Sequence, residues 1–399
     1  MEILSRFAST VAVLSLGLVP PLHTVAAANS SLAAVCGPVV TQPLAEPPWP
    51  LTRLRPDLAW PLTMGAGTTV AVIDSGVSAD HPSLRGKVRA GVDFVNPKAG
   101  PGQCDENGHG TLIAGIIVGR ETVSSGYRFH GVAPEASIVP VRVLRDQRRS
   151  FENDLSLRIA TAVGWAVDVG RADVINLSLT TLPTSQLQAA IQHALDRGVI
   201  VVAAAGNEGQ SAQPGQPLYP AAYDGVLGVA SIDTDDEHVA SSSTGTYVDV
   251  AAPGVRIAGP SPAGGGFLFS EEGGTSFAAA YVSGVAALVH SYHPDLTPAQ
   301  VIERITKTAE HPPDGWNPDI GYGVVDPARA VGALQVGTTP KAVPVEQLRP
   351  ATVAREAPRS LTVAATWVMA AGAAVVLLLL AAVPVVRRGR QRGWRSSRF

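Results

Sequence analysis

The stretch "GGTSFAAAYVSG", residues 273–284, decides how the chain is interpreted. Two glycines and a short hydroxyl-bearing turn lead into a run of small residues, which predicts a tightly packed helix reaching about His293. Ser276 opens that helix. A serine in this position is most often an N-cap. It becomes a candidate nucleophile only if the chain also supplies a base, a residue that orients the base, and donors for an anion.

The rest of the central region alternates between apolar runs and segments with helical spacing. Short buried strands are expected at 70–74, 136–144, 172–179, 199–207, 225–232 and 247–254. Helices are expected at 109–119, 153–170, 185–198 and 297–309. Ser185 is the predicted N-cap of the third helix, and Thr297 with Gln300 forms the pattern of a capping box. Strands that alternate with helices predict one α/β domain, residues 62–335, with a mostly parallel central sheet.

Four residues with reactive side chains fall at ends of these elements. Asp74 and Asn207 end strands, whereas His109 and Ser276 open helices. In open parallel sheets, such positions gather at the carboxyl edge of the sheet. A serine needs a base to take its proton, and a histidine needs a carboxylate on its other ring nitrogen. The amide of Asn207 and the backbone N–H of Ser276 are suitable donors to an oxyanion. Each residue alone has a structural explanation, but their joint occurrence predicts nucleophilic catalysis.

The segments that carry these residues resemble the successive signatures of the subtilisin-like serine proteases, peptidase family S8. They read "VAVIDSGV", "NGHGTLIAGII", "INLSL", "VAAAGN" and "GGTSFAAAYVSG", and the order Asp, His, Ser is that of the subtilisins. The resemblance implies a three-layer fold and an endopeptidase. In it, Asp74 orients the base His109, Ser276 is the nucleophile and Asn207 donates to the oxyanion.

The same resemblance implies a substrate groove in which a peptide docks as an extra strand. Ser178 and Leu179 match the family pattern, whereas Thr180 stands where many relatives have Gly, so we expect a narrower or reshaped S1–S4 groove. Small residues are expected to line the S1 pocket: Ala203, Ala204, Ala205 and Gly206. Ala280 stands where many relatives have Pro, and we expect the helix and the activity to persist there.

Both ends of the chain carry apolar segments. Residues 1–28 resemble a signal peptide cleaved near Ala28, with an uncleaved anchor as the alternative. Residues 362–386 are uncharged and long enough to cross ~30 Å of hydrocarbon as a helix; a buried core helix is the alternative. The basic tail, residues 387–399, follows at once. Positive flanks stay in the cytoplasm, so we expect a single-pass protein of the cell membrane with its protease domain outside the cytoplasm and its C-terminus inside.

A Pro-rich extension, residues 29–61, precedes the domain, and a Pro-containing linker, residues 336–361, follows it. The chain has two cysteines, Cys36 and Cys104. In an exported protein an even count suggests one disulfide, and two free thiols are the alternative. The extension is shorter than the inhibitor pro-domain of many relatives. We therefore expect it to stay attached through Cys36 and Cys104.

Charge and motifs exclude several classes of partner. Between residues 29 and 386 the chain has 23 basic and 32 acidic residues, a net charge of −9, which gives no reason to expect nucleic-acid binding. No cofactor or metal is predicted, because zinc motifs and EF-hand loops are missing from the sequence. Calcium binding by "DTDDE", residues 233–237, is the alternative to an acidic solvated loop.

The order of segments resembles that of the mycosins, the membrane-anchored proteases of type VII secretion systems. That resemblance implies protein or peptide substrates, a membrane location and neighbours in a secretion complex. Two alternatives remain at this point. The protein is mainly a structural component of such a complex with dispensable proteolysis, or it is a general protease of the cell envelope.

Overall fold

The computed structural model describes residues 36–98, 100–145, 154–209, 215–334 and 359–393. The predicted signal peptide, the first residues of the extension, nearly all of the linker and residues 394–399 lie outside this range. The chain divides into two compact units, residues 1–336 and 337–399. Each unit is described by itself.

A seven-stranded sheet, parallel throughout, forms the centre of the first unit, in the order β2-β5-β1-β6-β7-β8-β9. This confirms the predicted mostly parallel sheet. The two-residue strand β2 at one edge was not expected from the sequence. The strand bounds are β1 Thr69–Asp74, β2 Val92–Asp93, β5 Ser137–Arg142, β6 Val174–Leu177, β7 Ile200–Ala204, β8 Leu227–Ile232 and β9 Val250–Pro253.

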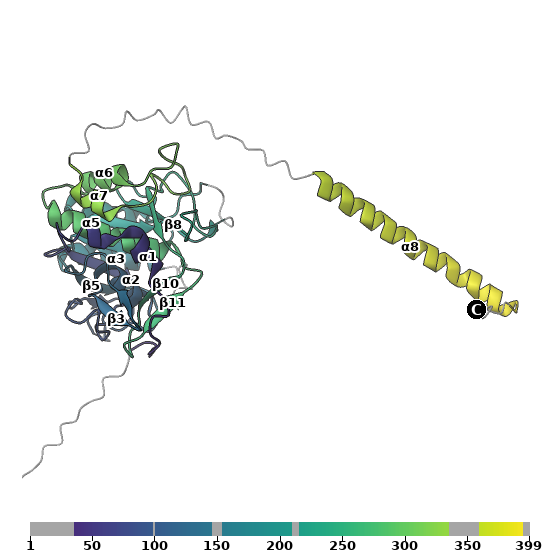
Figure 1. The fold of residues 1–399 in the computed structure, drawn as a ribbon, viewed down its shortest axis with the longest axis horizontal. Helices are drawn as coiled ribbons and strands as arrows, with labels where there is room; N and C mark the ends of the chain where they lie inside the picture. Colours follow the sequence, from purple (N-terminus) through teal and green to yellow (C-terminus); the bar gives the residue numbers. More distant parts are fainter. Residues whose placement is uncertain (1–35, 99, 146–153, 210–214, 335–358, 394–399) are drawn as a thin grey trace, which may run out of the picture. The chain divides into compact units, whose positions relative to one another are not determined.

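Helices cover both faces of the sheet and make the fold three-layered (Figure 1). In β1, Val70 and Val72 join a core with α2 (His109–Val118) and α5 (Thr275–Tyr292). The alternate residue Ile73 joins the opposite core, with α3 (Leu155–Asp168) and α4 (Ser185–Asp196). Because both faces are buried, the strands need uninterrupted apolar runs, which is the pattern that the sequence shows.

The small residues of α5 allow it to pack closely against five strands of the sheet, β1, β6, β7, β8 and β9. A Cβ added to Gly284 would lie 2.5 Å from Cβ of Val132, so only glycine permits this approach. Ala280 is fully buried within an unbroken helix, which confirms the prediction that the helix persists at this position. The close packing fixes the start of α5, where Ser276 lies.

Helix caps correct one prediction and confirm another. The N-cap of α4 is Thr184 rather than Ser185, because Oγ1 of Thr184 accepts the N–H of Leu187 (3.2 Å) and Ser185 is already helical. Helix α6 (Pro298–Thr308) has the predicted capping box between Thr297 and Gln300. Several short elements were not predicted: α1 Trp49–Leu54, the 3₁₀ turn Pro56–Leu58, α7 Pro327–Gly332, and the hairpins β3 Thr122–Ser124 with β4 Tyr127–Phe129 and β10 Ile257–Pro260 with β11 Phe267–Ser270.

The described part of the N-terminal extension is bound into the domain. The carbonyl of Gln42 in the extension accepts a hydrogen bond from the N–H of Phe267 (2.8 Å), which pairs the extension with the β10–β11 hairpin. Further along, Nε1 of Trp49 donates to the carbonyl of Val255 (2.8 Å). Arg53 forms ion pairs with Asp236 and Glu310, both at 2.8 Å. The extension therefore contributes to the core and surface of the folded unit.

The second unit is described as one helix, α8 (Arg359–Gln391), which includes the predicted span at 362–386. Within the described residues, one helical segment, Ala371–Gln391, is long and apolar enough to cross a membrane, with a mean hydropathy of 1.9. Arginines occupy its last turn, including Arg388 and Arg390.

Candidate active site

The four chemically reactive residues lie at the carboxyl edge of the sheet. Asp74 is the last residue of β1 and Asn207 follows the end of β7. His109 is the first residue of α2, and Ser276 is in the first turn of α5. Because α2 and α5 pack against each other on the same face of the sheet, their N-terminal ends are neighbours. The ring of His109 lies 5.5 Å from that of Phe277, directly after Ser276.

Asp74 and His109 form a buried pair. Oδ1 of Asp74 lies 2.8 Å from Nδ1 of His109, and the two residues are 0 % and 6 % exposed. Burial by itself lowers the pKa of His109, but the charge and hydrogen bond of Asp74 and the charge of Asp105 outweigh it, so the pKa is raised. The carboxylate fixes the proton on Nδ1, which leaves Nε2 as the basic nitrogen.

Ser276 is half-buried, and its hydroxyl donates to the backbone carbonyl of Ser178 (3.1 Å). Within the described residues, Nε2 of His109 is buried without a hydrogen-bond partner. The predicted role of His109 as base needs the serine hydroxyl at this nitrogen, and the structure has the hydroxyl on a different acceptor. Proton transfer requires that hydroxyl to turn from Ser178 to His109, a change that substrate binding commonly produces.

The side chain of Asn207 is held by its oxygen. Oδ1 accepts from the backbone N–H of Thr275 (2.8 Å) and from its hydroxyl (3.1 Å). The amide nitrogen Nδ2 lies close to Gly274, where an added Cβ would be 3.1 Å away. The oxygen of Asn207 accepts these two hydrogen bonds, and its Nδ2 keeps the N–H donors. The residue is exposed. The N–H of Ser276 is among the first helical N–H groups, which have no acceptor within the helix.

A cavity of about 240 Å³ joins the nucleophile to the predicted substrate segments. Its described lining is Leu144, Ser178, Leu179, Thr180, Ala204, Gly206, Asn207, Glu208, Thr275 and Ser276. Ala203 and Ala205, which the sequence also assigned to the pocket, are not among these described lining residues. Both are fully buried in the cores on either face of the sheet.

Glu208 is a pocket residue that the sequence analysis did not identify. Its carboxylate accepts from Ser243 Oγ (3.1 Å) and lies 3.5 Å from the hydroxyl of Thr180. Thr180 therefore places a hydroxyl in the cavity and against this acid. The signal was available, because Glu208 directly follows the oxyanion candidate Asn207 in the sequence.

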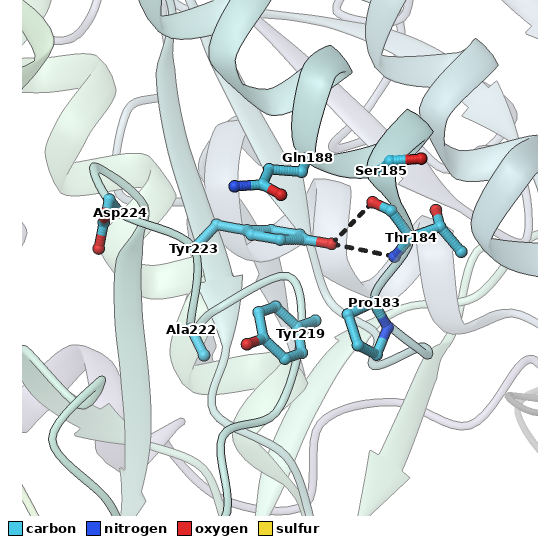
Figure 2. A pocket seen from close by; sticks show the side chains of 8 residues that line it. All are labelled: Pro183, Thr184, Ser185, Gln188, Tyr219, Ala222, Tyr223 and Asp224. Carbon is cyan, nitrogen blue, oxygen red and sulfur yellow. Dashed lines mark hydrogen bonds between the residues drawn. The ribbon is translucent and has the colours of Figure 1, made fainter.

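A second hollow, of about 470 Å³, has Pro183, Thr184, Tyr219 and Tyr223 among its lining residues (Figure 2). In it, the hydroxyl of Tyr223 donates to the carbonyl of Thr184 and lies within hydrogen-bonding distance of its N–H, both at 3.3 Å. The N–H of Thr181 donates to the carbonyl of Tyr219 (2.8 Å). These contacts fix the far end of the segment that lines the catalytic cavity.

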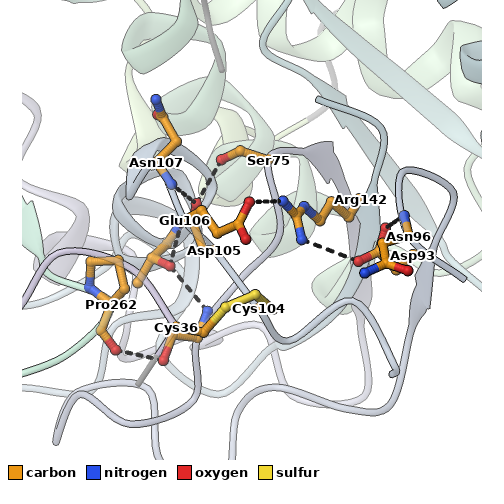
Figure 3. The surroundings of a disulfide bond; sticks show 12 residues. Cys36, Ser75, Asp93, Asn96, Cys104, Asp105, Glu106, Asn107, Arg142 and Pro262 are labelled. Atoms are coloured by element: carbon orange, nitrogen blue, oxygen red, sulfur yellow. Dashed lines mark hydrogen bonds and ion pairs between the residues drawn. A yellow bond between two sulfur atoms is a disulfide. The ribbon is translucent and has the colours of Figure 1, made fainter. Parts of the chain in front are cut away.

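Cys36 and Cys104 form a disulfide, as predicted. It joins the extension to residues 104–108, here called the histidine loop, which leads into His109 (Figure 3). Within the described residues, the one cluster with metal-like spacing is these two cysteines with Glu106, and its sulfurs are bonded to each other. The acidic stretch 233–237 was the alternative calcium site in the sequence. In it, the carboxylate of Asp236 forms an ion pair with Arg53 (2.8 Å).

Comparison with known proteins places this geometry in a family. Residues 65–323 match the subtilase family. Mycosin-4 of Mycobacterium tuberculosis is 38 % identical, and the match covers 85 % of this chain and 81 % of that protein. The chain belongs to the mycosins, within the subtilase family. It is therefore a serine protease of the subtilisin type.

Solved mycosin structures share the fold. The crystal structure of MycP1 with its N-terminal propeptide removed is 36 % identical, with a TM-score of 0.66, and the match covers 74 % of this mycosin and 100 % of that chain. A chain in the periplasmic assembly from the ESX-5 inner membrane complex is 29 % identical, with a TM-score of 0.66 and coverage of 77 % and 91 %.

Proposed function

We propose that this mycosin is a membrane-anchored serine endopeptidase that acts outside the cytoplasm through Asp74, His109 and Ser276. The observation that carries the proposal is the buried Asp74–His109 pair, 2.8 Å apart, beside a helix start that presents Ser276 to the cavity. A carboxylate, an imidazole and a hydroxyl in this order are the parts needed for acyl transfer.

The steps of the proposed reaction follow from the chemistry of these groups. Nε2 of His109 takes the proton of the Ser276 hydroxyl as Oγ attacks the peptide carbonyl, and Asp74 stabilises the imidazolium that forms. The oxyanion receives donors from Nδ2 of Asn207 and from the N–H of Ser276, at the positive end of the α5 dipole. His109 then gives its proton to the leaving amine, and water hydrolyses the acyl-enzyme by the same route.

The substrate is a polypeptide that lies along Ser178–Thr180 with its P1 side chain in the cavity of about 240 Å³. Backbone pairing along this segment supplies register and affinity, and the cavity supplies selectivity. Thr180 and Glu208 give the cavity a polar rim, whereas Ala204 and Gly206 leave it room.

The remaining segments of the chain concern the location of the enzyme at the membrane. In the proposed organisation, residues 1–28 are a cleaved signal peptide, 29–61 an attached extension, 62–335 the protease domain and 336–361 a linker. Residues 362–386 form the anchor and 387–399 a cytoplasmic tail. The uncharged span and the Arg-rich end of α8 support this topology.

The test is hydrolysis of peptide libraries by full-length protein in detergent. Ser276→Ala should abolish cleavage while leaving the fold unchanged, and Ser185→Ala, an exposed serine on α4, should cleave normally. Cleavage by the Ser276→Ala variant at the wild-type rate would refute the proposal.

A second function is favoured by one finding. A chain similar to this one belongs to the periplasmic assembly from the ESX-5 inner membrane complex, and we propose that this protein also serves as a component of a type VII secretion complex. Strains with Ser276→Ala and strains lacking residues 362–399 separate the roles. If secretion survives loss of the nucleophile but fails without the anchor, scaffolding is the essential role. If secretion already fails with Ser276→Ala, proteolysis is essential.

A further inference from the structure

Asp105 is a fully buried carboxylate that the proposed mechanism does not use. It accepts five hydrogen bonds, an unusually complete set for one side chain. Oδ1 receives Ser75 Oγ (2.9 Å), the N–H of Asn107 (3.2 Å) and the N–H of Gly108 (2.8 Å). Oδ2 receives the N–H of Thr111 (2.8 Å) and its hydroxyl (2.6 Å). Figure 3 shows Asp105, within the histidine loop, hydrogen-bonded to Ser75.

The donors belong to the two segments that make the catalytic pair. Ser75 directly follows Asp74, whereas Gly108 and Thr111 flank His109 on either side. Asp105 is therefore hydrogen-bonded both to the end of β1 and to the first turn of α2. These bonds fix the position of the backbone at Asp74 relative to the backbone at His109.

We propose that Asp105 is a positioning residue for His109 and that its negative charge, second to that of Asp74, favours the protonated imidazole. This inference rests on the proposed role of His109 as the base. It goes beyond that role by assigning the reaction a fourth ionisable group that does not touch substrate.

The electrostatics agree with the geometry. Two anions act electrostatically on His109, Asp74 from β1 and Asp105 from the histidine loop, and its ring neighbour on α5 is the uncharged Phe277. After the opposing effect of burial, both anions contribute to the raised pKa of His109. Burial raises the pKa of Asp105 itself, and its donors oppose that shift because they stabilise the carboxylate.

The histidine loop is held in place from outside as well. Cys104 is bonded to Cys36, and Glu106 forms an ion pair with the buried Arg142 (2.6 Å). A Cβ on Gly37 would lie 2.1 Å from the carbonyl oxygen of Asp105, so the extension packs directly against the loop backbone. The disulfide and this backbone packing keep Asp105 in reach of its five donors, whereas the side chain of Glu106 is largely exposed.

The first test is the pH profile of kcat/KM for the full-length protein and its Asp105→Asn variant. The acidic limb reports the free base. Removing the charge should shift that limb to lower pH by roughly 0.5–1 unit, and loss of acceptors should lower kcat more than it changes KM. The matched control is Glu106→Gln, which removes a neighbouring charge on the same loop. It should leave the limb in place.

The second test needs no turnover. In ¹⁵N-histidine-labelled protein with Ser276→Ala, the His109 signals, assigned with His109→Gln, should titrate at lower pH when Asp105→Asn is added. An unchanged titration pH, or an equal shift from Glu106→Gln, would overturn the inference even if Asp105→Asn unfolds more easily. Because this readout is independent of cleavage, it separates failure of the inference from failure of the proposed function.

Discussion

The disulfide between Cys36 and Cys104 gives a stability prediction that can be worked out from the chain. The perturbation is the double change Cys36→Ser, Cys104→Ser, which avoids leaving one free thiol. The bridge closes a loop with a sequence separation of 68 residues. For a loop of that size, the chain-entropy relation gives about 4 kcal/mol of stabilisation at 25 °C.

That free energy converts to a shift in unfolding temperature. With ~2.1 cal/mol/K of unfolding entropy per residue over roughly 300 ordered residues, we expect the double variant to unfold roughly 6 °C lower. The assay is scanning calorimetry of full-length protein in detergent. Dithiothreitol should lower the wild-type midpoint by the same amount and leave the double variant unchanged.

One outcome would refute the reasoning. If the double variant unfolds within about 1 °C of wild type, the extension is held by its other contacts and the bridge adds little. Those contacts include the ion pairs of Arg53 and the hydrogen bond of Trp49. A change confined to activity would instead mean that the disulfide acts locally on the histidine loop.

Three further predictions concern the site and the core. Asn207→Ala should lower kcat by ~10²–10³ with little change in KM, as for loss of one oxyanion donor; a change in KM alone in steady-state kinetics would contradict this. Glu208→Gln should reduce the kcat/KM for P1 Lys relative to P1 Leu by about fivefold, since a partly exposed ion pair is worth ~1 kcal/mol; equal losses on both substrates would count against a P1 contact. Burial raises the pKa of Asp249 to about 7, so its contribution to stability is present below pH ~4 and is lost as pH rises through 7. Asp249→Asn should therefore gain stability relative to wild type in thermal melts at pH 9 compared with pH 5, and a difference independent of pH would refute it.

Local patterns were enough to predict the parts of the fold that depend on local chemistry. The strand at Asp74 and the helix at Ser276 have uninterrupted apolar or small-residue runs because both are buried on all sides. The β10–β11 hairpin was missed because each of its strands has only four residues, too few to show a period, and because its other partner, the extension around Gln42, lies more than 200 residues away in sequence. Pairing at that distance leaves no periodic signal.

In the candidate site, too, some features follow from local sequence patterns and others only from the folded arrangement. Ala203 and Ala204 were both assigned to the pocket, yet successive residues of a strand point to opposite faces, and only Ala204 lines the cavity. That alternation was readable in the sequence. The hydroxyl of Ser276 and the carboxylate of Asp105 have partners on other elements, Ser178 and Ser75. Those partners follow only from the folded arrangement.

The central claim is that Ser276 is the nucleophile and that the Asp74–His109 pair activates it. The direct measurement is reaction of full-length protein with a fluorophosphonate probe, followed by mass spectrometry of the labelled peptide. The account predicts one adduct, on Ser276, and a much slower reaction for Asp74→Asn and His109→Gln. An adduct on another serine, or labelling of Ser276 that is as fast without His109, would contradict it.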